Sequence, residues 1–245
     1  MSWYKQTWGI YLIILGGLLV LALGIGFWQF YSYRQALIGG EITKEEFLAK
    51  FGVNENEDFE IDVEKYFESA ESVKVKALAG SAPSFGSKDA SVVIVAFEDF
   101  YCSHCQDVFP EVKEILSSYG DKINFIYRQF PLLGNTDAAV ASLCADEQGM
   151  FWPFHDLLYQ SQVGLGGELY ASLATQLGLN QNRFSNCLVE ETYKAKIQAD
   201  VAVGQAYGAS ATPTLFINGF KIAGEFKASQ ITPIIDYLLE YYSQE

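Results

Sequence analysis

The apolar positions divide the chain into a long hydrophobic run near the start, an acidic stretch and a segment patterned like a folded domain. Residues 91–97 (SVVIVAF) form a continuous, largely β-branched run, which predicts a strand buried on both faces. The other expected elements of this segment are, in order, a helix from the cysteine motif to Tyr119, a strand at 123–127, only helical patterns from Asp137 to about Gly208, two strands at 214–217 and 221–223 around the turn signal Asn218-Gly219, and a closing helix at 230–242. This order predicts an α/β domain.

The longest apolar run, residues 8–28, predicts a membrane anchor. Its 21 residues carry no charge and would span roughly 30 Å as a helix, the thickness of a bilayer core. Aromatic residues flank it at both ends, as is typical of membrane interfaces. A cleaved secretory signal with Lys5 and the small residues Ala22-Leu23-Gly24 is the alternative, but the run continues past that site. We therefore expect an uncleaved transmembrane helix within residues 1–34.

Residues 35–72 are predicted to form an acidic spacer. From 41 to 72 there are eleven acidic residues against three lysines, and Thr43-Lys44-Glu45-Glu46 is a capping box that predicts a short helix. The simplest interpretation is a solvated link that holds the main domain, residues 73–245, away from the membrane; a docking surface is the alternative. The formal net charge of −14 argues against binding to a nucleic-acid backbone.

The motif Cys102-Ser103-His104-Cys105 is the main candidate for chemistry. Two cysteines at this spacing suit zinc, a stapled turn or redox exchange, but zinc needs four ligands and the sequence has no second closely spaced pair. The motif follows a buried strand and opens a helix, so backbone N–H groups and the helix dipole would stabilise a Cys102 thiolate. A protonated His104 would add positive charge nearby. Both effects stabilise the reduced pair, which is the property of an oxidant.

Four ordered motifs resemble the DsbA-like branch of thioredoxin-fold proteins. They are FEDFYCSHC at 97–105, AAVASLCADEQG at 138–149, FWPFHD at 151–156 and ATPTLFING at 211–219. The resemblance implies a thioredoxin fold with a helical insertion at about 135–207. It also implies that Cys102 is the nucleophile and Cys105 the resolving thiol. Pro213 matches the family's cis-proline facing the cysteines, with Thr212 offering backbone hydrogen bonds to substrate; from the sequence alone this proline would simply start a strand.

Two positions depart from the family pattern. Ser103 stands where DsbA has proline, which puts the redox potential of the pair in question. Ala96 stands where the branch usually carries a buried glutamate that helps to move the proton of the buried thiol. Glu98 lies two residues on and on the same strand face, so it is a candidate proton carrier; a solvated residue at the strand end is the alternative.

Two further cysteines and a histidine lie in the predicted helical block. If Cys102 pairs with Cys105, Cys144 and Cys187 remain, either as a structural disulfide of an exported domain or as two buried thiols. The disulfide is our expectation. His155 lies among aromatic and aliphatic residues, and we expect it to be a packed side chain outside the site.

These observations predict an extracytoplasmic thiol–disulfide oxidoreductase, anchored in the cell membrane by one helix, that introduces disulfides into exported proteins. The cysteine pair is the redox centre, so no cofactor and no metal are expected. The resemblance implies a quinone-linked membrane reoxidant of the DsbB or vitamin K epoxide reductase type. A membrane-bound reductase or isomerase, and a non-catalytic peptide-binding chaperone, are the alternatives.

Overall fold

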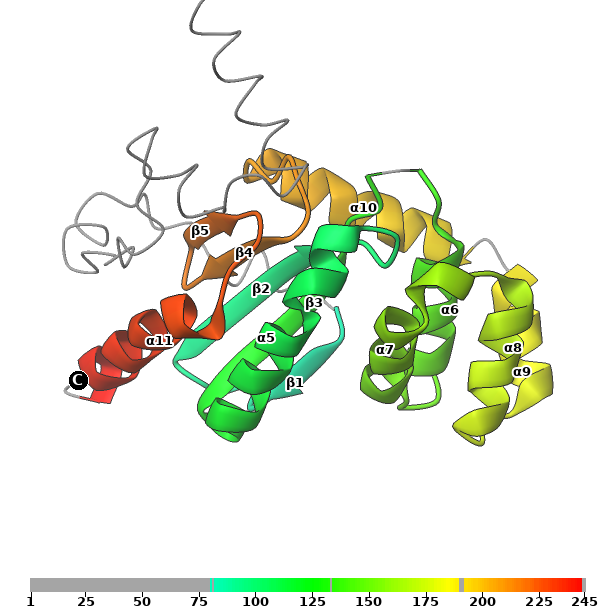
Figure 1. Cartoon of the computed structure of the whole chain (residues 1–245), viewed down its shortest axis with the longest axis horizontal. Helices are drawn as coiled ribbons and strands as arrows, with labels where there is room; N and C mark the ends of the chain where they lie inside the picture. The colour runs from blue at the N-terminus through cyan, green and yellow to red at the C-terminus, as the bar shows by residue number, and fades with distance from the viewer. Residues whose placement is uncertain (1–79, 81, 133, 190–191, 244–245) are drawn as a thin grey trace, which may run out of the picture. The chain divides into compact units, whose positions relative to one another are not determined.

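The computed structural model describes Gly80 and residues 82–132, 134–189 and 192–243. Its centre is a five-stranded sheet in the order β1-β3-β2-β4-β5 (Figure 1). The strands are β1 (Ser84–Gly86), β2 (Val92–Glu98), β3 (Ile123–Gln129), β4 (Thr214–Ile217) and β5 (Phe220–Ala223). The helices are α5 (Ser103–Tyr119), α6 (Asp137–Asp146), α7 (Phe151–Gln160), α8 (Gly167–Gln176), α9 (Gln181–Val189), α10 (Thr192–Ala206) and α11 (Ala228–Ser243), with 3₁₀ turns at Gly120–Lys122 and Gln162–Gly164.

Strand β2 lies in the middle of the sheet. It pairs in parallel with β3 and antiparallel with β4. The β4–β5 hairpin turns at Asn218-Gly219, where both residues have positive φ (46° and 94°), as a tight hairpin requires. The Asn218 side chain also accepts a hydrogen bond from the Val93 N–H at 2.7 Å and donates one to the Ser91 carbonyl at 2.9 Å. The turn residue therefore fixes the hairpin against β2.

The two faces of the sheet are covered by different helices. Alternate β2 residues, including Ile94 and Ala96, pack against buried residues of α5 and α11 on one face. Val95 and Phe97 point to the other face, which α10 covers. Close approach of α10 depends on Gly204, because a Cβ there would lie 2.7 Å from Phe130 and 2.9 Å from Phe97. This layering places the carboxyl end of β2 and the first turn of α5 beside the insertion.

Helices α6 to α9 form the insertion and have a hydrophobic core of their own (Figure 1). That core also includes Phe100 and Cys105 from the cysteine loop and helix, and Tyr127 from β3. The insertion therefore packs directly against the segment that carries the cysteine motif. It is joined internally by a disulfide between Cys144 of α6 and Cys187 of α9.

The elements agree with the sequence pattern except at β1, which the pattern did not predict. This strand has three residues and is defined by its antiparallel pairing with β3 rather than by its own composition. The anchor predicted in 1–34 and the spacer predicted in 35–72 lie outside the described residues. Within the described part of the chain, no helix is both long and apolar enough to cross a membrane.

Candidate active site

The two cysteines of the motif lie at the start of α5 in contrasting surroundings. Cys102 is the residue that caps the helix and is partly exposed, whereas Cys105 lies one turn further on and is fully buried. Both are free thiols. The Cys102 carbonyl accepts the Gln106 N–H at 3.2 Å, and the Cys102 N–H donates to the Asp99 carbonyl at 3.0 Å. These bonds fix Cys102, the nucleophile candidate, at the N-terminal end of α5.

The surroundings separate the acidities of the two thiols. The pKa of Cys102 is lowered from 9.0 to about 5, mainly by a hydrogen bond from the Cys105 side chain, with further help from Thr212 and from the N–H groups of Cys105 and His104. Its partial burial opposes this effect. Burial raises the pKa of Cys105 far above its usual value, and the bond to Cys102 and the charge of Glu98 act in the same direction. At neutral pH the pair therefore holds one accessible thiolate and one buried thiol.

A cis peptide bond between Thr212 and Pro213 forms the wall opposite the cysteines. The Cys102 Sγ lies 3.4 Å from the Thr212 carbonyl oxygen. This backbone oxygen can only accept a hydrogen bond, and it can accept one only from the protonated Cys102 thiol. The hydrogen bond that lowers the pKa of Cys102 is a different one, in which the Thr212 side chain must act as the donor. The structure thus brings together the nucleophile candidate and the Thr212–Pro213 segment, 110 positions apart in sequence.

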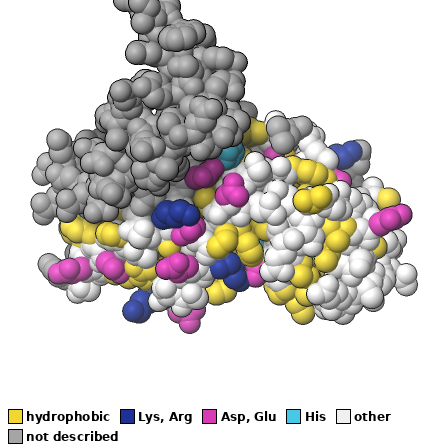
Figure 2. Space-filling model, viewed as in Figure 1, with side chains coloured by type: hydrophobic (Ala, Val, Ile, Leu, Met, Phe, Trp, Pro, Cys, Tyr) yellow, Lys and Arg dark blue, Asp and Glu magenta, His cyan; other side chains and the backbone are white. Residues whose placement is uncertain are grey.

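His104 and Ser103 are exposed on the first turn of α5. His104 Nδ1 lies 2.5 Å from the carboxylate of Glu225, and this bond, with the negative charge of Cys102, raises the pKa of the histidine. Asp107 completes an exposed group whose potential metal-ligating atoms lie within 4.8 Å of one another, the one such group among the described residues. The ion pair holds two of its three residues, His104 and Glu225, together. In the part of the face that Figure 2 draws in colour, acidic, basic and apolar side chains are interspersed.

Glu98, the candidate proton carrier, is only 2% exposed, so it is not a solvated residue at the strand end. The Tyr159 hydroxyl donates a hydrogen bond to Glu98 Oε2 at 2.8 Å, while Oε1 is buried without a hydrogen-bond partner among the described residues. Burial raises the pKa of Glu98 to about 7; the bond from Tyr159 lowers it, and the negative charge of Cys102 raises it further. A carboxyl group with this pKa can give or take a proton near neutral pH.

The end of α7 and the turn after it hold the cysteine loop through polar contacts that the sequence did not reveal. The Gln162 amide nitrogen donates to the carbonyls of Phe100 and Cys102, at 2.9 Å each. In the opposite direction, the Gln106 amide donates to the Tyr159 carbonyl at 2.8 Å. These partners lie 53 to 62 positions apart, so neither spacing nor periodicity could have identified them.

His155 is packed, as expected, and lies outside the exposed site. It is 1% exposed, pairs with Asp156 at 3.0 Å and is surrounded by aromatic rings, including those of Phe100, Tyr127 and Tyr159. Burial lowers its pKa and favours the neutral ring.

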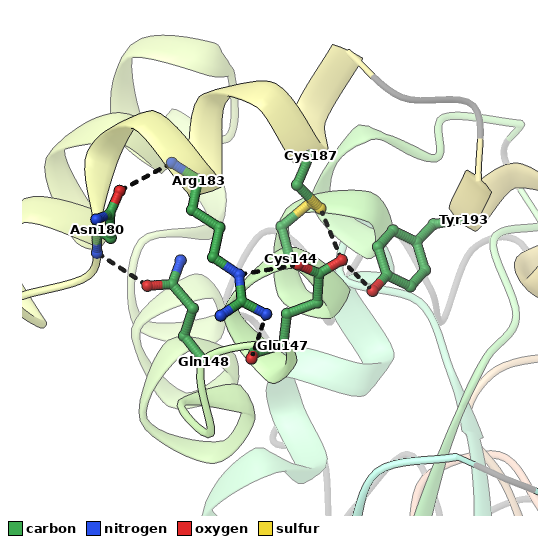
Figure 3. A network of polar contacts seen from close by, with 7 residues as sticks. All are labelled: Cys144, Glu147, Gln148, Asn180, Arg183, Cys187 and Tyr193. Atoms are coloured by element: carbon green, nitrogen blue, oxygen red, sulfur yellow. Dashed lines mark hydrogen bonds and ion pairs between the residues drawn. A yellow bond between two sulfur atoms is a disulfide. The ribbon is translucent and has the colours of Figure 1, made fainter.

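The Cys144–Cys187 disulfide lies within a polar network of the insertion (Figure 3). Glu147 accepts a hydrogen bond from the Tyr193 hydroxyl at 2.6 Å and forms an ion pair with Arg183 at 3.4 Å. Its Oε1 also lies 3.6 Å from the Cys187 sulfur, which in a disulfide has no proton to donate. The bond and the network together join α6 to α9.

Comparison with known proteins identifies related sequences and folds. The family model described as Thioredoxin matches residues 79–237. Disulfide bond formation protein D of Bacillus subtilis is 29% identical over 152 residues, covering 56% of this chain and 67% of that protein. The Na(+)/H(+) antiporter NhaA of Herminiimonas arsenicoxydans is 32% identical over 152 residues, 62% of this chain and 24% of that protein. The chain thus spans about a quarter of the length of the curated antiporter relatives that it matches.

Solved structures give the same fold. The oxidised crystal structure of BdbD from Bacillus subtilis has a TM-score of 0.58 at 25% identity and covers 70% of this chain and 97% of that chain. The thiol–disulfide exchange protein alpha-DsbA2 from Wolbachia pipientis has a TM-score of 0.61 at 21% identity, covering 72% and 95%. The latter similarity supports the fold alone.

Proposed function

Because this chain belongs to the thioredoxin family, we propose that it is a thiol–disulfide oxidoreductase of the DsbA type that forms disulfides in other proteins through Cys102 and Cys105. A substrate thiolate attacks Cys102 Sγ of the oxidised pair, the Cys102–Cys105 bond breaks, and Cys105 leaves as a thiolate that takes up a proton. A second substrate thiolate then attacks the substrate sulfur of the mixed disulfide and releases the Cys102 thiolate. Two electrons pass from the substrate dithiol to the cysteine pair, and no further cofactor takes part.

The observation that carries this proposal is the opposite acidity of the two thiols beside Thr212. The low pKa of Cys102, about 5, makes it a good leaving group in the second exchange and stabilises the reduced pair. The raised pKa of Cys105 keeps that thiol protonated once it has been released. Stabilisation of the reduced pair favours oxidation of substrates over their reduction.

We assign the proton taken up by Cys105 to Glu98. The Cys105 sulfur accepts a hydrogen bond from the backbone N–H of Asp99, the residue next to Glu98, and the charge of Glu98 acts on the Cys105 thiol. Glu98 has a pKa of about 7, so both of its protonation states are populated at neutral pH. It stands in for the acid that the family pattern places at Ala96.

The first experiment measures the redox equilibrium of the full-length chain with glutathione. An oxidase is expected to equilibrate well above the potential of cytosolic thioredoxin, about −270 mV, and to oxidise a reduced model protein at a rate that Cys102→Ser abolishes. A potential near the thioredoxin value would instead indicate the reductase or isomerase. A biological effect that survives in Cys102→Ser would indicate the peptide-binding chaperone.

We further propose that the domain works on the extracytoplasmic side of the cell membrane, with residues 8–28 as its anchor. The Cys144–Cys187 disulfide is consistent with an oxidising compartment. A quinone-linked membrane protein of the DsbB or vitamin K epoxide reductase type would return the reduced pair to the disulfide. Membrane fractionation and labelling of Cys102 in intact cells with a membrane-impermeant thiol reagent test the location. Labelling only after lysis would contradict it.

A further inference from the structure

We propose that Tyr159 of the helical insertion is a positioning residue for the buried proton transfer, because its hydroxyl holds one oxygen of Glu98 and leaves the other to exchange a proton with Cys105. The inference rests on the proposed function and extends it. It assigns to the insertion a part in the chemistry of a cysteine pair that is carried by α5.

The hydrogen bonds around Glu98 have a defined direction. A phenol has one hydrogen to donate, and the Tyr159 hydroxyl donates it to Glu98 Oε2 at 2.8 Å. The Tyr127 hydroxyl, 3.1 Å from that of Tyr159, must then donate to Tyr159. The chain of bonds therefore runs from Tyr127 through Tyr159 to Glu98, and all three side chains are at most 2% exposed. Donors arranged in this way strengthen one another and favour the carboxylate.

This arrangement makes the two oxygens of Glu98 unequal. Oε2 is occupied by Tyr159, whereas Oε1 is buried without a partner among the residues that the structure describes. A buried oxygen without a hydrogen-bond partner costs free energy of folding, and such an atom calls for an explanation. Here a role in function explains it, because Oε1 is available to carry the transferred proton. The Tyr159 carbonyl also accepts the Gln106 amide at 2.8 Å, which ties the same residue to the first turns of α5. Tyr159 therefore fixes both the acid and the helix that carries Cys105.

The test follows the reaction of reduced full-length protein, purified in detergent, with oxidised glutathione. The Cys102 thiolate attacks the glutathione disulfide and releases one glutathione thiolate, which leaves glutathione bound to Cys102. Cys105 then transfers its proton to Glu98 and attacks Cys102 Sγ, which closes the protein disulfide and releases the second glutathione thiolate. Acid quenching and mass spectrometry separate the two steps, because only the intermediate carries the added glutathione mass.

Tyr159→Phe keeps the ring and removes the donor. In the native protein the pH midpoint of the second step is expected near or somewhat below 7, because glutathione on Cys102 removes the charge that helps to raise the pKa of Glu98. In the variant it should rise by about one unit or more, since the lost bond goes to a charged group. At pH 7 the second step should slow at least about two-fold and recover at higher pH, while the first step is unchanged. Tyr193→Phe is the matched control, because it also removes a tyrosine hydroxyl bonded to a glutamate, Glu147, but lies away from the cysteine pair. It should leave the midpoint unchanged.

Glu98→Gln supplies the reference and should abolish the pH midpoint, so that adding Tyr159→Phe to it has no further effect. An unchanged midpoint in Tyr159→Phe, or an equal slowing at every pH, would overturn the role of Tyr159 while leaving thiol exchange intact. A native second step without a titration near pH 7 would overturn it as well. Failure of oxidised glutathione to form either the Cys102 adduct or the Cys102–Cys105 disulfide would overturn the proposed function itself.

Discussion

The low pKa of Cys102 predicts that reduction of the active pair stabilises the protein increasingly as the pH rises. In the folded, reduced protein the pKa of Cys102 falls from 9.0 to about 5. The oxidised protein has no titrating thiol at this position. A depressed pKa contributes its full stabilisation above the unfolded value of 9.0, and that contribution is lost as the pH falls through about 5.

Linkage gives the size of the effect. Between pH 4 and pH 8 the shift corresponds to about 4 kcal/mol in favour of the reduced form. Cys102 is partly exposed, so solvent screens the interactions that stabilise its thiolate. We therefore expect the free energy of unfolding of the reduced form, minus that of the oxidised form, to rise by about 2 kcal/mol over this interval.

Urea denaturation of both redox forms at pH 4, 6 and 8 measures this difference. The reduced form is prepared in a glutathione buffer that opens the active pair and leaves the buried Cys144–Cys187 disulfide closed, as checked by mass. Cys102→Ser has no thiolate and cannot form the active disulfide, so its free energy of unfolding should rise with pH no more than that of the oxidised native protein. A difference between the redox forms that stays constant from pH 4 to pH 8 would refute a stabilised thiolate at Cys102.

Two other substitutions test the surroundings of the pair. Glu225→Gln removes the carboxylate charge that helps to raise the pKa of His104, so less imidazolium remains at pH 7 and the pKa of Cys102, followed by thiolate absorbance, should rise; an unchanged value would show that the histidine charge does not reach the sulfur. Replacing both Cys144 and Cys187 by alanine opens a loop that spans 43 positions and should lower the free energy of unfolding by about 4 kcal/mol. The Cys102 pKa should stay the same in that protein, and a large shift would contradict a purely structural role for the disulfide.

Local pattern accounts for most of the fold because the elements carry their own signals. The apolar run at 91–97 became β2, and the Asn218-Gly219 signal became the tight turn of the β4–β5 hairpin. Strand β1 was missed because Ser84–Gly86 has no periodic pattern and exists through its pairing with β3. A strand of this kind can be found only from the partner that it meets in three dimensions.

The candidate site likewise has one part that the local sequence shows and another part that depends on contacts in three dimensions. The cysteine motif was visible because its four residues are contiguous and sit between a predicted strand and a predicted helix. The partner of His104, Glu225, lies 121 positions away, and the partner of Glu98, Tyr159, lies 61 positions away. Neither partner belongs to a recognisable spacing. The sequence could therefore indicate the reacting atoms and the residues that lower the pKa of Cys102, but not the side chains that bind His104 and Glu98.

The position of the buried acid follows from the geometry of β2. Side chains two residues apart in a strand share a face and lie about 7 Å apart along it, so Glu98 occupies the same face as Ala96 but one step closer to the cysteine loop. Ala96 packs within the core between the sheet and the helices α5 and α11. Glu98 lies at the end of the strand, where α7 supplies the Tyr159 hydroxyl. An acid at position 98 therefore depends on the insertion for its hydrogen bond, which explains why a departure at Ala96 can be compatible with the same thiol chemistry.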